Sequence, residues 1–251
     1  MITVFYTFYD SPIPDKQYKE FLLQLPDEER KRNSRFRRWQ DQHAHLIGRL
    51  LLLKGLIARG FPSDVLHRIK ISPYGKLLLE DKIQFNLSHS QTGVVCAITD
   101  NGNIGVDMEA IRETDINSFF DYMNEEEWKE IQESDDKQSA FFEYWTKKEA
   151  VMKADGRGLR LPFKQVHLAN GYSLVAGAQW HLKKIEIEKR YICHLAIDRS
   201  DSKITKIEVK KDDLATLLAT FRSKELATAP HRRQQTKKFE FSAACCKNLS
   251  V

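Results

Sequence analysis

Residues 104–109 read Ile-Gly-Val-Asp-Met-Glu and lie near the middle of a chain of 251 residues. Val106 and Met108 alternate with Asp107 and Glu109, and a period of two is typical of a β-strand that is packed on one face. The two carboxylates then project from the same face, roughly 7 Å apart. Two hard oxygen ligands suit Mg²⁺. Asp-x-Glu is nevertheless a common pattern, and an ordinary exposed strand face is the alternative.

Strands and helices are also predicted before this strand. Residues 2–9 are rich in β-branched and aromatic types, which indicates a strand. The proline and acids of 26–29 favour the start of a helix, and leucines spaced by three and four predict another helix over 41–59. Asn101-Gly102 predicts a hairpin turn into the strand that carries the acids. Further strands are expected at 66–72, 76–79, 85–87 and 94–99.

The sequence after Glu109 is predicted to be mainly helical up to residue 154, and further strands are predicted after residue 171. Helices are expected at 116–123, 125–133, 137–154 and 212–221. Strands are expected at 172–175, 179–187, 190–197 and 204–209.

Each half of the chain therefore holds strands and helices in similar amounts, which predicts an α+β fold of two lobes that meet at a shared cleft. We expect an N-terminal lobe at 1–102, a C-terminal lobe at 103–225 and a disordered basic tail at 226–251.

The net charge of +5 is concentrated at the end of the chain. Residues 226–251 carry five basic residues and one acid, so the rest of the chain is nearly neutral. A nearly neutral body argues against a general nucleic-acid-binding protein. One local exception is 30–38, where six basic residues stand without an acid. This run could bind a phosphorylated ligand or an acidic partner, or it could be a solvated helix face.

The four cysteines show neither a CxxC motif nor metal-ligand spacing, which indicates reduced thiols. No apolar run reaches the roughly 18 residues that a membrane span needs, and the N-terminus lacks the basic leader of a signal peptide. We therefore expect a cytoplasmic monomer that binds neither membranes nor nucleic acid.

A second group of charges lies on the helix predicted over 137–154. Phe142 and Trp145 fall on its apolar stripe, and Glu149 falls in the same sector, four residues after Trp145. The carboxylate is therefore predicted to point inward. Lys153 lies four residues after Glu149, so a surface ion pair is the alternative.

A third polar group is Phe85-Asn86-Leu87-Ser88-His89-Ser90. Hydroxyls, an amide and an imidazole at the end of a buried strand can bind a phosphate. A histidine whose hydrogen bonds are satisfied within a loop is the alternative.

Taken together and in this order, these segments resemble the Sfp-type 4′-phosphopantetheinyl transferases. Residues 105–109 match the family's Gly-Val-Asp-x-Glu, and residues 145–153 match its Trp-Ser/Thr-x-Lys-Glu-Ala/Ser-x-x-Lys. The resemblance covers about residues 1–221 and is supported by Tyr74-Gly75-Lys76, by residues 85–90 and by Gly156-Arg157-Gly158-Leu159.

The resemblance implies two pseudo-symmetric lobes with coenzyme A as co-substrate in the cleft between them. It implies that Mg²⁺ binds Asp107, Glu109 and Glu149, with Glu127 where family members carry a further acid near the metal. The residues that it assigns to coenzyme A are Arg30, Arg32, Arg35, Lys76, Ser88, His89, Lys148 and Lys153, and the last two are expected to face phosphate oxygens.

The implied reaction moves the phosphopantetheine arm of coenzyme A to a serine of an apo-carrier protein, acyl or peptidyl, with release of 3′,5′-ADP. The expected catalytic residues are Asp107, Glu149 and Lys153, and Glu149 serves either as a metal ligand or as the general base. The carrier is expected to dock near 156–163, whose apolar residues either contact it or belong to the core.

Two other functions are considered beside this one. The first is a metal-dependent nuclease, because acids followed by a lysine can also build a magnesium site. The second is a non-catalytic protein that binds carriers.

Overall fold

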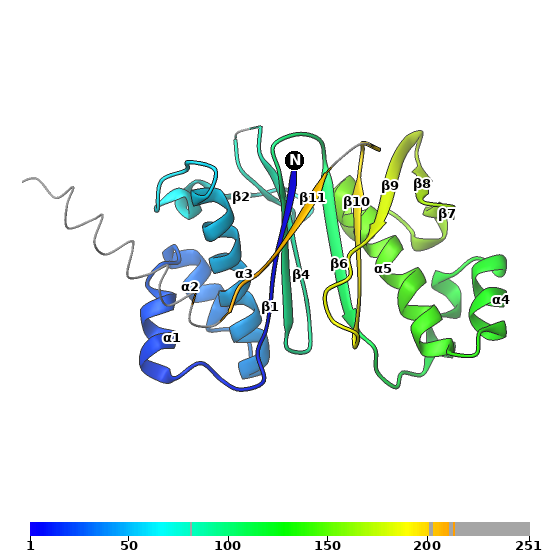
Figure 1. Ribbon diagram of the computed structural model, residues 1–251, viewed down its shortest axis with the longest axis horizontal. Coiled ribbons are helices and arrows are strands. Elements are labelled where there is room, and N and C mark those ends of the chain that lie inside the picture. The colour runs from blue at the N-terminus through cyan, green and yellow to red at the C-terminus, as the bar shows by residue number, and fades with distance from the viewer. Residues whose placement is uncertain (81, 201–202, 211–212, 214–251) are drawn as a thin grey trace, which may run out of the picture.

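Two β-sheets pack face to face in the middle of the molecule, and helices cover the outer face of each (Figure 1). The computed structural model describes residues 1–80, 82–200, 203–210 and 213. The predicted α+β class is confirmed. None of the helices in this part of the chain combines the length and the hydropathy that crossing a bilayer requires.

The first sheet has four strands in the order β11-β1-β5-β4. Its strands are β1 (Ile2–Phe8), β4 (Gln84–Ser90), β5 (Gly93–Thr99) and β11 (Ile204–Glu208). β1 runs parallel to β11, and the other neighbours are antiparallel. β5 is buried along its whole length because both of its edges are paired and both of its faces are covered.

The second sheet has five antiparallel strands in the order β6-β10-β9-β8-β7. Its strands are β6 (Ile104–Ala110), β7 (His167–Ala169), β8 (Tyr172–Val175), β9 (Ala178–Lys184) and β10 (Tyr191–Ile197). A separate short ribbon pairs β2 (Lys70–Ile71) with β3 (Leu77–Leu78).

The longest helices cover the two sheets. Helix α3 (Trp39–Ile57) packs on the first sheet, and α1 (Asp15–Leu22) and α2 (Asp27–Asn33) pack on α3. Helix α5 (Lys137–Asp155) packs on the second sheet, and α4 (Glu125–Glu133) packs on α5. A third apolar layer, from β1, β5, β6 and β10, fills the space between the sheets.

The predicted hairpin at Asn101-Gly102 is wrong. A turn is present and Gly102 has φ +80°, but the turn carries the chain from one sheet to the other. Because β1 and β4 already occupy both edges of β5, β6 pairs with β10 instead.

The chain also returns to the first sheet near its end. The predicted lobe boundary between 102 and 103 coincides with the turn between the sheets, yet β11 pairs with β1. The division into lobes therefore stays a prediction. The helix expected at 212–221 and the tail expected at 226–251 lie outside the described residues, apart from Asp213.

Two segments adopt 3₁₀ helices in place of the predicted strand and α-helix. The strand predicted at 66–72 begins as a 3₁₀ helix, Val65–Arg68, because Val65 and Leu66 are buried in the core and only the short β2 follows. The helix predicted at 116–123 is a 3₁₀ helix, Ile116–Tyr122.

Gly105 allows α5 to lie directly on β6. A Cβ at this position would lie 2.1 Å from the carbonyl oxygen of Ala150 and 2.3 Å from the amide nitrogen of Ala154. Both atoms belong to the helix backbone, so no side chain can move away to make room. The glycine thereby brings the C-terminal half of α5, with its charged residues, close to the acids of β6.

We expect Gly105→Ala to lower the free energy of unfolding by about 3 kcal/mol, at the upper end of overpacking effects, because the whole helix must move. Gly48→Ala is the matched control, since its added methyl would meet side-chain atoms and no backbone, Leu87 Cδ2 at 3.1 Å and Val94 Cγ1 at 3.7 Å. Urea unfolding of both variants measures the difference. Equal stability of the two variants would contradict the role assigned to Gly105.

Candidate active site

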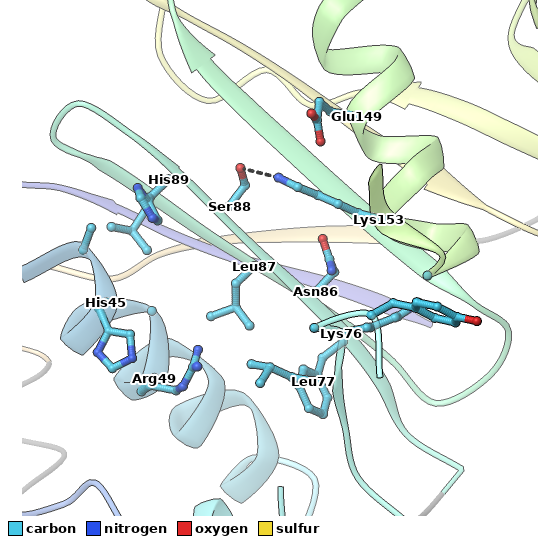
Figure 2. Close-up of a pocket in the computed structure, with 18 of the residues that line it drawn as sticks. His45, Arg49, Lys76, Leu77, Asn86, Leu87, Ser88, His89, Glu149 and Lys153 are labelled. Atoms are coloured by element: carbon cyan, nitrogen blue, oxygen red, sulfur yellow. Dashed lines mark hydrogen bonds between the residues drawn. The ribbon is translucent and has the colours of Figure 1, made fainter. Parts of the chain in front are cut away.

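A cavity of about 370 Å³ lies between α3, β4 and the end of α5 (Figure 2). A second cavity, of about 290 Å³, adjoins it. Both are lined by Leu87, Ser88, His89, Glu149 and Lys153, and the second also by Asp107, Glu109 and Trp145. Two joined cavities with convergent charged groups can hold an extended, polar ligand.

The acid pair of β6 lies at the wall of the smaller cavity. Asp107 is 3% exposed, and its Oδ1 accepts hydrogen bonds from Ser88 Oγ at 2.8 Å and from Lys153 Nζ at 2.5 Å. Glu109 Oε2 accepts from Ser90 Oγ at 2.6 Å and from Arg112 Nη1 at 2.9 Å. One oxygen of each carboxylate is thus held by the protein.

Lys153 links α5 to this acid pair. Its ammonium donates to Ser88 Oγ at 3.0 Å (Figure 2). It also donates to Asp107. Burial alone would lower the pKa of Lys153, but Asp107 and Glu149 reverse the effect and raise this pKa above its ordinary value. The side chain therefore carries a full positive charge at the cavity wall.

Glu149 lines both cavities, one helical turn before Lys153. Within the described part of the chain its carboxylate accepts no hydrogen bond. Burial raises the pKa of Glu149, and Asp107 and Glu109 raise it further, while Lys153 opposes them. A carboxylate with this environment is destabilised in its charged form and would be stabilised by a cation.

The predicted metal ligands Asp107, Glu109 and Glu149 all line the smaller cavity. Their carboxylates do not form a complete metal site. No group of three or more His, Cys, Asp or Glu side chains among the described residues is arranged to hold a metal ion. Two observations nevertheless fit a hard cation. The donors are all carboxylate oxygens, and Asp107 Oδ2 is buried with no hydrogen-bond partner in the described structure.

Five of the side chains expected to hold coenzyme A line the larger cavity: Arg32, Lys76, Ser88, His89 and Lys153. Lys76 also donates to the carbonyl oxygen of Ala154 at 2.8 Å, near the end of α5. Burial lowers the pKa of Lys76, although Asp155 and Asp198 oppose the shift. Ser88 differs from its expected role, because its hydroxyl proton is donated to Asp107.

The structure does not place Arg30 and Arg35 where they were expected. Neither is among the residues that line the two cavities. The Arg30 guanidinium pairs with Asp27 and donates to the carbonyl oxygen of Leu25, so acids of the preceding turn neutralise part of the basic run. Arg35 is exposed to solvent.

The expected phosphate contact of Lys148 is also wrong. Lys148 is fully buried, forms an ion pair with Glu127 at 2.8 Å, and donates to the carbonyl oxygens of Phe163 and Val166 at 3.1 Å. Glu127 also accepts from the backbone of Asn124 in a capping box of α4. The pair joins α4, α5 and the loop before β7, and neither residue lines a cavity.

Comparison with known proteins identifies the family. A family model described as the 4′-phosphopantetheinyl transferase superfamily matches residues 103–205, a range that contains the acid pair and the whole of α5. Over this range the chain is similar to the 4′-phosphopantetheinyl transferase superfamily. The predicted family is thereby confirmed.

Several curated members of this superfamily are similar to the chain. The 4′-phosphopantetheinyl transferase gsp of Aneurinibacillus migulanus is 37% identical over 49% of this chain and 52% of its own length. The 4′-phosphopantetheinyl transferase Sfp of Bacillus subtilis is 28% identical over 62% of this chain and 70% of its own length. The 4′-phosphopantetheinyl transferase HetI of a Nostoc species is 33% identical over 58% of this chain and 65% of its own length. The match thus spans about half of the gsp relative and somewhat more of the other two.

The sequence did not single out one further polar cluster. Arg49 Nε donates to Glu29 Oε2 at 2.7 Å, and His45 Nε2 lies 3.0 Å from the same oxygen. Arg49 and His45 both line the larger cavity. Burial alone would raise the pKa of Glu29, but the hydrogen bonds from His45 and Arg49 lower it to about 2. An arginine inside an otherwise apolar helix, Leu46 to Leu53, was the only signal of this cluster.

Two apolar residues near 156–163 belong to the core. Leu161 is 1% exposed, and Phe163 is buried and stacks on Trp145 with ring centroids 4.7 Å apart. Neither offers a free apolar surface to a partner. Arg157 pairs with Asp155, and Arg160 lies over the ring of Tyr74.

The raised pKa of Glu149 predicts a variant that is more stable than the wild type. A glutamate whose pKa is raised by folding destabilises the folded state at pH values above that pKa, and the effect vanishes below the unfolded value of about 4.5. We expect Glu149→Gln, without divalent cations, to raise Tm by a few degrees at pH 7 and to match the wild type near pH 4. Thermal unfolding at both pH values measures this, and a lower Tm at pH 7 would contradict it.

Proposed function

We propose that the protein transfers the 4′-phosphopantetheine group of coenzyme A to a serine hydroxyl of an apo-carrier protein, acyl or peptidyl. The serine oxygen attacks the β-phosphorus, the bond to the bridging oxygen breaks, and 3′,5′-ADP leaves. The observation that carries the proposal is the convergence of Asp107, Glu149 and Lys153 at one cavity that shares five lining residues with a larger one. The protein is proposed to act as a monomer in the cytoplasm.

The larger cavity is proposed to hold the nucleotide end of coenzyme A. Arg32, Lys76 and His89 offer donors to its phosphates, and the joined smaller cavity would receive the pyrophosphate. Lys153 is positioned to stabilise the negative charge that develops on the phosphoryl oxygens, since its ammonium lies at the boundary of both cavities.

Asp107, Glu109 and Glu149 are the residues that would hold Mg²⁺, and the fit rests on their oxygen donors and on the partnerless Asp107 Oδ2. Bound there, the ion would neutralise pyrophosphate charge and orient the phosphates. Glu149 is proposed to serve in one of two roles, as a ligand of this ion or as the general base that takes the serine proton. Its carboxylate is not engaged by another described residue. Its raised pKa makes it a stronger base than an exposed glutamate.

Two alternatives are less well supported. A nuclease needs a basic groove for DNA, whereas the body of the chain is nearly neutral and its superfamily is one of transferases. A non-catalytic carrier-binding protein would have no need to keep Asp107, Glu109, Glu149 and Lys153 together.

The test is incubation of the protein with coenzyme A, Mg²⁺ and a panel of apo-carriers, followed by intact-mass measurement. We expect at least one carrier to increase by the mass of one phosphopantetheinyl group. Asp107→Ala and Glu149→Ala should remain folded and lose transfer. A wild-type protein that modifies no carrier but nicks DNA in Mg²⁺ would overturn the proposal, and full activity in either variant would overturn the assigned site.

A further inference from the structure

β6 has an unpaired edge that faces β4, although the two strands belong to different sheets. β6 is the first strand of its sheet, so its outer N–H groups have no neighbouring strand there. β4 is likewise the last strand of the other sheet. Backbone N–H groups at a strand edge that is buried cost free energy unless they find hydrogen-bond acceptors.

Side chains of β4 supply those partners. Asn86 Oδ1 accepts from the N–H of Val106 at 3.0 Å. Ser88 Oγ accepts from the N–H of Met108 at 3.4 Å, and Ser90 Oγ accepts from the N–H of Ala110 at 3.1 Å. Each acceptor precedes its donor by 20 residues, so both strands advance by two residues at each step. The three side chains form a ladder, which we call the polar ladder.

The two serines of the polar ladder also donate, and the asparagine makes no contact with an acid among the described residues. Ser88 donates its proton to Asp107 Oδ1, and Ser90 donates its proton to Glu109 Oε2. Each serine therefore bonds the backbone N–H of one residue and the carboxylate of the residue before it. Both serines are buried, with 6% and 7% of their surface exposed.

We infer that Ser88 and Ser90 are positioning residues that fix one oxygen of Asp107 and one of Glu109, so that the other oxygen of each is left for a cation. Asn86 accepts a hydrogen bond from the backbone of β6 as the serines do, but it does not orient a carboxylate. The inference rests on the proposed metal site. It assigns Ser88 and Ser90 a role that differs from phosphate binding, because their hydroxyl protons are donated to acids.

The inference predicts that metal binding and stability respond separately to substitutions in the polar ladder. Ser88→Ala and Ser90→Ala should each weaken Mn²⁺ binding 10- to 100-fold and lower Tm, because the carboxylate loses its orienting donor and the backbone N–H loses its acceptor. Asn86→Ala should lower Tm similarly and leave the Mn²⁺ Kd within about twofold of the wild type. Ser173→Ala is the control for loss of a buried hydroxyl, since Ser173 donates only to the carbonyl oxygen of His167.

The experiment measures Mn²⁺ binding to the free protein from the EPR signal of the unbound ion, well below Tm, and Tm by calorimetry. An unchanged Mn²⁺ Kd in both serine variants overturns the inference, and so does an equal loss of affinity in Asn86→Ala. A wild-type protein that binds no Mn²⁺ overturns the proposed metal site itself. Because neither coenzyme A nor carrier is present, failure of the transfer assay alone does not affect this result.

Discussion

Lys153→Met is expected to lower kcat/KM for phosphopantetheine transfer by about a thousandfold. Lys153 supplies the ammonium that Asp107 and Ser88 hold at the boundary of the two cavities. Removing one group that stabilises transition-state charge costs about 10²–10³ in rate. The upper figure applies here because Asp107 also loses the only charged donor that it has among the described residues. Lys153→Arg keeps the charge with a different shape, and we expect it to recover part of the rate.

Lys147→Met is the matched control for this prediction. Lys147 lies on the same helix, pairs with Glu143 at 3.7 Å and lies over the ring of Tyr144, away from both cavities. Its loss should leave kcat/KM within about twofold. Steady-state transfer assays at saturating Mg²⁺ measure all three variants. Equal rates for the methionine variants at positions 147 and 153 would remove Lys153 from the site.

Lys148→Met is expected to lower the free energy of unfolding by about 3–5 kcal/mol, although the residue stands beside Glu149 in the sequence. The substitution leaves Glu127 buried and charged without its partner, which is the costly way to break a buried ion pair. The carbonyl oxygens of Phe163 and Val166 also lose their donor.

A double substitution separates the destabilisation caused by an unpaired Glu127 from the net contribution of the ion pair to stability. Lys148→Met with Glu127→Leu should recover most of the lost stability, because an apolar pair of similar volume no longer leaves a charge buried. Urea unfolding of the wild type, both single variants and the double variant completes the cycle. In the folded fraction we expect KM for coenzyme A to stay within about threefold, and a rise of tenfold or more would restore the phosphate role that the sequence suggested for Lys148.

Much of the site could be predicted from local pattern. The period of two placed Asp107 and Glu109 on one face of a strand, and the helical period placed Glu149 and Lys153 on the side of α5 that faces β6. The phosphate role of Lys148, which the family resemblance implied, is wrong. A helical stripe shows which side of a helix is buried, but it does not show whether the buried charge meets a ligand or, as here, the carboxylate of another helix.

The hairpin prediction failed for a related reason. An Asn-Gly turn between two apolar strands predicts only that the chain reverses. Whether the strands then pair depends on which edges other strands have already taken, and β1 and β4 are separated from β6 by many residues. The hydrogen bonds from Arg49 and His45 to Glu29 could not be predicted either, because they join α3 to α2 across the fold.

The sequence by itself determined the α+β class, the family and the identity of the charged residues, because period, turn chemistry and motif spacing are properties of neighbouring residues. The tertiary structure alone decided which charges share a cavity, which are neutralised by buried partners and which side chains complete the edge of β6. Hydrogen bonds and ion pairs depend on distances of a few ångströms, and between Ser88 and Asp107, or Glu127 and Lys148, only the packing of whole elements sets those distances.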